Sequence, residues 1–155
     1  MSEVTTQATA QRMPRSHTLQ SAPLLAWLRM VRVVSRTQRA ATDHLRQFDL
    51  TPAQFDVLAQ VGATPGPSQQ ELADRLLVTQ GNVCQLLDGL EKKKLVERRR
   101  EGRSNRIFLT TDGQALASQA VPEHETWQAE RMTALEEEEQ RELLRLLRKL
   151  DRSQQ

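Results

Sequence analysis

The centre of the chain constrains the fold most strongly. Residues 68–71 (SQQE) have the pattern of a capping box that begins a short helix, and Thr79 can cap a second helix running to about Lys93. Residues 95–100 and 106–110 then have the pattern of two short strands joined by a turn. We therefore predict two short helices followed by a β-hairpin.

The second of these helices has two different faces. Its apolar side chains recur three and four residues apart, which predicts that they pack inward: Val83, Leu86, Leu87 and Leu90. The opposite face is polar and carries Gln80, Gly81, Asn82, Gln85 and Asp88. Glutamine and asparagine can bond adenine through two hydrogen bonds, so this face suits base reading in a major groove. A plain solvated face would show the same spacing, and both interpretations stay open.

The hairpin is rich in arginine. It contains Arg98, Arg99, Arg100, Arg103 and Arg106, more positive charge than solubility requires. Guanidinium groups beside a recognition helix favour contacts with phosphates or the minor groove. We predict a DNA-contacting set of twelve residues: Ser68, Gln69, Thr79, Gln80, Gly81, Asn82, Gln85, Arg98, Arg100, Arg103, Ser104 and Arg106.

Charge is segregated along the chain, although the total is only +2. Residues 79–106 hold 8 Lys and Arg against 4 Asp and Glu, whereas residues 123–142 hold 8 Glu against 2 Arg. Such segregation offers one basic face to a polyanion, or it reflects unrelated solvated faces. Aromatic residues make up 3% of the chain, a lean core for one globule, so we expect apolar surface to be buried against a second copy.

We predict four segments. Residues 1–21 are polar and suit a flexible arm, and residues 22–50 form a long apolar helix for dimerisation. Residues 51–110 form the DNA-binding unit, and residues 111–155 form C-terminal dimerisation helices. The predicted fold class is mainly α with a small β-wing, a winged helix-turn-helix flanked by N- and C-terminal dimerisation helices.

Several local details are also predicted. Leu72, Ala73, Leu76 and Leu77 form the buried stripe of the first short helix, and Val78 is the turn residue. Residues 111–114 are expected to cap a helix that reaches about Ala134, with an irregularity at Pro122. An amphipathic helix is expected over residues 140–152.

Taken together and in order, five stretches make the chain resemble the MarR family of bacterial transcription regulators over roughly residues 22–152. They are residues 50–58 (LTPAQFDVL), 70–73 (QELA), 86–98 (LLDGLEKKKLVER), 101–104 (EGRS) and 109–113 (LTTDG). The resemblance implies a homodimer on a pseudo-palindromic operator in double-stranded DNA, with residues 79–93 as the recognition helix. It also implies that Arg103, at the wing tip, enters the minor groove.

The sequence departs from the family pattern at four positions. Glu101 stands where the wing usually has Asp, which pairs with a nearby Arg, and Lys94 stands where Gly is usual. A left-handed backbone disfavours lysine, so the turn at Lys94 is expected to differ. Cys84 and Gln85 replace the frequent Thr and Arg, and Gln85 should shift operator preference toward adenine.

The leading functional hypothesis is a dimeric repressor released by a small ligand, which the resemblance suggests is an aromatic acid. Candidate ligand residues are Arg15, His17, Trp27, Arg29 and Arg32, since arginine suits a carboxylate and tryptophan a ring. Dimer packing of Trp27 and a disordered arm for Arg15 and His17 are the competing interpretations.

Other functions are also open. Cys84, the single cysteine, could be a redox switch or a small buried residue, and the basic hairpin alone would permit a nonspecific architectural protein. His44 and His124 could meet with Glu123 or Glu125 at a metal, but surface histidine is the default, and we predict no metal site or cofactor. The sequence contains no phosphate loop or nucleophile elbow, so no enzyme is predicted. With no apolar run of about 20 residues and no signal core, a cytoplasmic protein is expected.

Overall fold

The computed structural model describes residues 21–102 and 104–154. The chain divides into two compact units, Met1–Arg39 and Ala40–Gln155. The described part of the first unit consists of Ser21 and most of helix α1 (Ala22–Leu45). Large apolar side chains on this part of α1 are exposed, among them Trp27 at 56% and Val34 at 53%.

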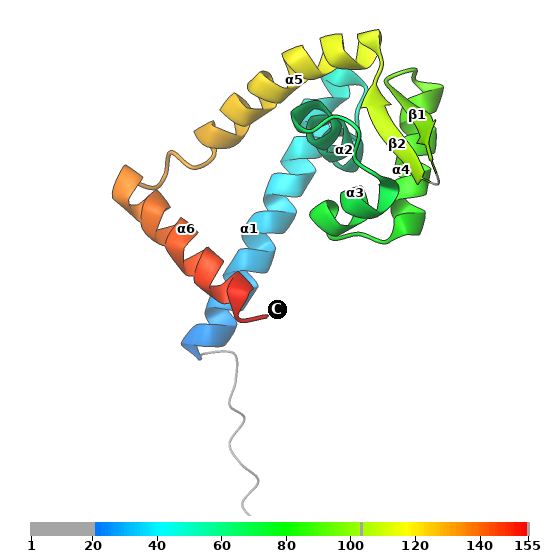
Figure 1. Cartoon of the computed structure of the whole chain (residues 1–155). Helices are drawn as coiled ribbons and strands as arrows, with labels where there is room; N and C mark the ends of the chain where they lie inside the picture. The colour runs from blue at the N-terminus through cyan, green and yellow to red at the C-terminus, as the bar shows by residue number, and fades with distance from the viewer. Residues whose placement is uncertain (1–20, 103, 155) are drawn as a thin grey trace, which may run out of the picture. The chain divides into compact units, whose positions relative to one another are not determined.

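The second unit contains the remaining elements, and Figure 1 labels its helices α2 to α6 and its strands β1 and β2. They are the 3-10 helix η1 (Arg46–Phe48), α2 (Pro52–Ala63), α3 (Gln69–Leu76), α4 (Gln80–Lys92), β1 (Val96–Glu101), β2 (Ser104–Leu109), α5 (Thr111–Glu130) and α6 (Glu137–Arg152). The predicted fold class is therefore confirmed: a mainly helical chain carries a helix-turn-helix and a two-stranded antiparallel wing.

Local capping explains where the short helices begin. Thr51 and Ser68 each form a capping box, in which the hydroxyl accepts from the third residue and that residue's side chain accepts from the cap backbone N–H. Thr79 caps α4 by accepting from the N–H of Asn82 at 3.2 Å. Helix α5 is capped by Thr110 and not by Thr111 as predicted, because the Thr110 hydroxyl accepts from the N–H of Gly113 at 3.0 Å.

The turn between α3 and α4 differs from the prediction by one residue. Leu77 was expected in the buried stripe, but it adopts a left-handed backbone (φ 53°) and is 90% exposed. Its backbone N–H closes the end of α3 by donating to the Asp74 carbonyl at 3.4 Å. Val78 is partly buried and packs against the core in its place.

The wing is a regular hairpin with a tighter turn than predicted. Glu101 pairs with Ser104, so the turn comprises only two residues where five were expected. Gly102 adopts φ 62°, the left-handed conformation that such a turn requires. The hairpin is joined to the helices by Ile107, which is fully buried and whose backbone N–H donates to the Pro67 carbonyl at 3.0 Å.

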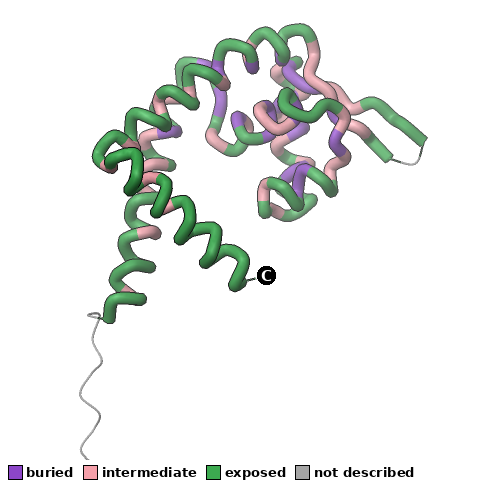
Figure 2. Tube along the Cα trace, turned by 60° about the vertical axis from the view of Figure 1, so that its left-hand side comes forward, coloured by how far each residue is buried: buried purple, intermediate pink, exposed green. Residues whose placement is uncertain are grey.

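The core lies where α2, α3 and α4 meet the hairpin and the start of α5, as the purple segments of Figure 2 show. Its largest fully buried side chains include Leu58, Leu72, Leu87, Leu90 and Ile107. By contrast, no residue of α6 is buried, and every residue of that helix is described. Among the described helices, none combines the length and apolar character needed to cross a bilayer.

Candidate DNA-binding surface

Helix α4 has the two faces that its sequence predicts. Val83, Leu87 and Leu90 are fully buried against the core, which fixes the helix in the winged unit. The first residues of α4 lie on the other side and are exposed: Gln80, Gly81, Asn82 and Gln85. The N-terminal end of a recognition helix is the part that reaches base edges in a helix-turn-helix complex, so these amides stand at the appropriate place.

A crevice lies between the start of α3 and the second strand of the wing. It has a volume of about 480 Å³ and is lined by Ser68, Gln69, Gln70, Glu71, Ser104, Asn105 and Arg106. Arg106 reaches the Glu71 carboxylate at 2.9 Å and the Gly66 carbonyl at 3.3 Å. Hydrogen bonds from Ser68 lower the pKa of Glu71, and the charge of Arg106 acts in the same direction.

Arg98 is engaged within the chain, although the sequence grouped it with the DNA-contacting arginines. Its guanidinium bonds the Asp88 carboxylate at 2.7 Å, the Glu91 carboxylate, and the Cys84 carbonyl at 3.3 Å. Its side chain is 19% exposed. Arg98 therefore holds the base of the wing against α4. A guanidinium carries five N–H donors in one plane, so it can bond two carboxylates at once. These bonds give Arg98 a role in positioning the wing, and its contact with DNA stays a prediction.

The other wing arginines differ in their availability. Arg99 pairs with Glu97 and lies over the Phe108 ring, 4.6 Å from its centroid. Arg100 is exposed, and none of the ion pairs among the described residues includes it. Arg103, predicted to enter the minor groove, lies outside the described residues, whereas its neighbour Ser104 is exposed.

The structure describes two of the positions at which the sequence departs from the family pattern, Lys94 and Glu101. Lys94 adopts φ 59°, so the chain keeps the left-handed turn despite lacking glycine, and the expected difference in the turn is wrong. The Lys94 carbonyl accepts from the Thr110 hydroxyl at 2.6 Å, which holds the turn against the start of α5. Within the described ranges no ion pair includes Glu101, so the expected acid–arginine pair of the wing stays a prediction.

The structure also places the residues of the ligand, metal and redox hypotheses. Trp27, Arg29 and Arg32 are exposed on α1 in the first unit, whereas Arg15 and His17 lie outside the described residues. The His44 and His124 rings do meet, with centroids 5.3 Å apart, and Trp127 stacks on both.

Burial lowers the pKa of His124, and His44 and Arg131 add to this effect. In the described part of the chain, no three His, Cys, Asp or Glu side chains are grouped to hold a metal. Cys84 is partly buried, with Sγ 3.7 Å from Gln69 Oε1.

Sequence reasoning missed two residues next to the predicted base readers. Gln70 was not in the DNA-contacting set, yet its amide bonds Gln80 of α4 and the Asp74 carboxylate. The four-residue spacing of Gln70 and Asp74 is a recognisable helical pair. The contact with Gln80 depends on how α3 and α4 cross, and no local pattern reveals it.

Known proteins share both the sequence and this architecture. Residues 48–107 match the MarR family. An uncharacterised helix-turn-helix-type transcriptional regulator of Bacillus cereus is 37% identical over 127 residues, covering 81% of this chain and 86% of its own length. The structure of Staphylococcus aureus MepR in complex with DNA is 29% identical, with a TM-score of 0.76, and the match covers 83% of this chain and 98% of that one.

A MarR/EmrR family regulator from Acinetobacter sp. ADP1 has the same fold at 21% identity, with a TM-score of 0.77 and coverage of 86% and 96%. The relatives at higher identity are transcriptional regulators, and one of them, MepR, is solved in complex with DNA. The chain belongs to the MarR family and is a DNA-binding transcriptional regulator with a winged helix-turn-helix.

Proposed function

We propose that this regulator is a cytoplasmic homodimer that represses transcription from a pseudo-palindromic operator and is released by a small ligand. The observation that carries the proposal is the set of exposed amides at the start of α4, beside the arginines of the wing. Gln80, Asn82 and Gln85 would read base edges, with Gln85 favouring adenine. Arg100, Arg103 and Ser104 would contact the backbone or minor groove, and Ser68, Gln69, Thr79, Gly81 and Arg106 would contact phosphates.

The dimer proposal is supported by apolar surface that a single chain leaves exposed. Trp27, Leu28 and Val31 of α1 are more than 40% exposed, as are Leu146 and Leu147 of α6. Residues 22–50 and 111–155 are therefore proposed as dimerisation segments around a DNA-binding unit of residues 51–110. Two-fold symmetry would then place two copies of α4 about 34–36 Å apart, one turn of the duplex.

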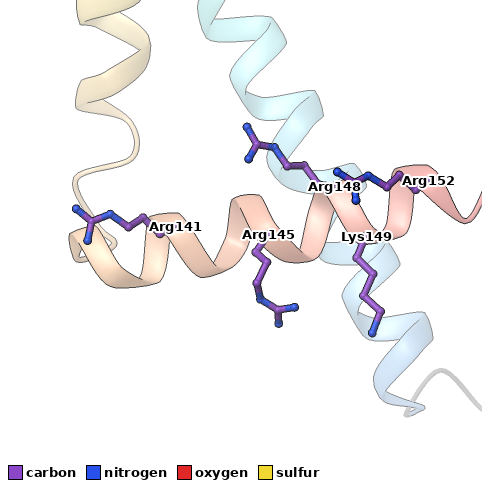
Figure 3. Close-up of a pocket in the computed structure, with 5 residues that line it drawn as sticks. All are labelled: Arg141, Arg145, Arg148, Lys149 and Arg152. Atoms are coloured by element: carbon purple, nitrogen blue, oxygen red, sulfur yellow. The ribbon is translucent and has the colours of Figure 1, made fainter.

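The charges of α6 favour antiparallel pairing with its own copy. Glu137–Glu139 and Glu142 outnumber Arg141 in its first half, whereas Arg145, Arg148, Lys149 and Arg152 outnumber Asp151 in its second half. Figure 3 shows Arg148 and Arg152 leaving the helix on one side and Arg145 and Lys149 on another. An isologous contact that crosses two antiparallel α6 helices would bring each acidic half against a basic half.

Selection of bound sequences from a random duplex pool tests the DNA-binding part of the proposal with the full chain. We expect a two-fold symmetric motif, and at least about a thousand-fold preference for it over random duplex. Gln80→Ala and Asn82→Ala should each flatten the preference at particular base pairs, whereas Gln119→Ala, an exposed glutamine of α5, should not. Equal affinity for every duplex would instead favour an architectural protein.

The assembly and release parts need separate measurements. Sedimentation at micromolar concentration should show a dimer, and a monomer would contradict the symmetric operator.

Titration with benzoate should weaken operator binding in a gel shift, and Arg29→Ala or Arg32→Ala should reduce that effect. Flat titrations by calorimetry and gel shift would remove the aromatic-acid proposal. If peroxide changed operator affinity in the wild type but not in Cys84→Ser, redox control would replace it.

A further inference from the structure

The strongest unexplained feature of the candidate surface is a chain of hydrogen bonds that ends on a predicted base reader. Gln70 of α3 donates from its Nε2 to the Asp74 Oδ1 at 2.7 Å. The Gln70 Oε1 in turn accepts a hydrogen bond from the Nε2 of Gln80, the first residue of α4. All three side chains are exposed on the face that the proposed function directs at DNA.

We propose that Asp74 and Gln70 form an amide relay that sets which hydrogen-bonding groups Gln80 presents to the base edges. The inference rests on the proposed function, because it concerns how the same surface selects its operator. Asp74 and Gln70 act as positioning residues in this relay, and Gln80 is the residue that touches the base.

The direction of the relay follows from the chemistry of its first member. An ionised carboxylate can only accept hydrogen bonds, so the Gln70 amide must turn its NH₂ group toward Asp74. Its carbonyl oxygen then faces α4, where it can only accept. Gln80 must therefore donate one of its two amide hydrogens to Gln70.

The orientation of Gln80 determines the pattern it offers in a major groove. With one hydrogen committed to Gln70, the Gln80 amide retains its carbonyl oxygen as an acceptor and one N–H as a donor. Adenine presents the complementary pair, a donor at N6 and an acceptor at N7, whereas guanine presents two acceptors at O6 and N7. The relay should therefore make Gln80 select adenine and reject guanine.

Without the relay this selectivity should weaken. A glutamine whose amide is free to rotate can direct its NH₂ group outward and satisfy a guanine acceptor. Water would stabilise either orientation in the free protein, but the groove of a bound duplex excludes much of that water. The fixed orientation of the Gln80 amide then increases the difference in affinity between adenine and guanine. The contacts to phosphates are unchanged.

Selection from a random duplex pool with the full chain tests the relay through base preference. Gln80→Ala first identifies the base pair that Gln80 reads. Asp74→Ala should reduce the preference for adenine over guanine at that base pair from roughly ten-fold to within about two-fold, with preferences elsewhere retained. Asp56→Ala, which removes an exposed carboxylate from α2 outside the predicted DNA-contacting set, controls for the change in net charge.

A compensating variant separates the relay from simple packing. In the double variant Gln70→Glu with Asp74→Ala, residue 70 can only accept, and the net charge equals that of the wild type. It should restore the adenine preference that Asp74→Ala removes, because Gln80 is again forced to donate. Thermal unfolding midpoints of all variants should agree closely, since the three positions are exposed.

The possible failures are distinguishable. A wild type that selects no motif would remove the proposed function and the relay with it. A wild type that selects a motif that Gln80→Ala leaves intact would overturn the relay alone. The same holds if Asp74→Ala keeps the adenine preference sharp, or if the double variant does not restore it.

Discussion

Leu87 of α4 and Leu147 of α6 both lie on amphipathic helices, yet Leu87 is fully buried and Leu147 is 41% exposed. The difference extends to their surroundings. Leu87 belongs to a contiguous core shared by α2, α3, α4 and the wing, whereas no side chain of α6 is buried. Helical periodicity thus identifies an apolar face. Only the packing shows whether that face is buried within the chain or left exposed in a single copy.

This contrast separates the leucines that stabilise the fold from those that would stabilise a dimer. Full burial of a leucine side chain contributes about 1.5–3 kcal/mol, so the winged unit carries most of the folding free energy. Exposed leucines and valines contribute little until a second surface covers them. The following substitutions test that division.

Gly113→Ala should have the largest effect. A Cβ at Gly113 would lie 1.8 Å from the carbonyl oxygen of Leu95, and a backbone atom cannot move aside as a flexible side chain can. We expect a loss of about 4 kcal/mol or more, measured by urea denaturation. Gly62→Ala on α2 is the matched control, since its Cβ would make an ordinary 3.4 Å contact with Leu109.

A stable Gly113→Ala protein would contradict the close approach of α5 to the backbone of Leu95. The control should be neutral or stabilising by up to about 1 kcal/mol, because alanine is the better helix former.

Leu87→Ala and Leu147→Ala test the comparison directly. Leu87→Ala should cost about 3 kcal/mol of unfolding free energy because it opens a cavity in the core. Leu147→Ala should change the unfolding of a dilute sample by less than about 0.5 kcal/mol. It should instead raise the dimer dissociation constant by about ten-fold, measured by sedimentation, since a two-fold interface loses the side chain twice. Equal losses of unfolding free energy from both variants would show that α6 belongs to the core.

Arg98→Ala should disturb the position of the wing while the rest of the winged unit stays folded. It leaves Asp88 and Glu91 without their shared partner, and the partial exposure of these groups limits the expected loss to about 1–2 kcal/mol. Operator affinity should fall more than self-association, as gel shift and sedimentation would report. Arg98→Lys keeps the charge but not the fork, so it should recover only part of the affinity. Unchanged operator binding would refute the proposal that Arg98 positions the wing for DNA binding.

Several parts of the fold were predictable because their causes are local. The capping boxes at Thr51 and Ser68 involve side chains three residues apart, and the two faces of α4 follow from helical spacing. The exposure of Gln80, Asn82 and Gln85 is as expected, and their contact with DNA stays a prediction. Helical periodicity places Leu77 in the buried stripe, because spacing alone does not show that α3 ends at Leu76.

The arginines of the wing show where sequence reasoning stops. Arg98 and Arg100 are the same residue type two positions apart on one strand, so the sequence offers no distinction between them. Arg98 lies at the base of the hairpin within reach of two carboxylates of α4, whereas Arg100 lies nearer the exposed tip. The bond between Gln70 and Gln80 depends in the same way on the packing of two helices. Roles that depend on tertiary neighbours were not predictable.

Lys94→Gly should have the smallest effect, and it sharpens the comparison by stabilising the winged unit alone. Lys94 holds φ 59°, a conformation that costs a side-chain-bearing residue about 1 kcal/mol and glycine almost nothing. We expect the variant to gain up to about 1 kcal/mol of unfolding free energy, with an unchanged dimer dissociation constant. Lys94→Ala should bring no such gain, because alanine keeps the Cβ, and this excludes loss of the lysine charge as the cause. A gain in both variants would attribute the effect to charge, and a rise in dimer affinity would show that the winged unit and the end helices are coupled.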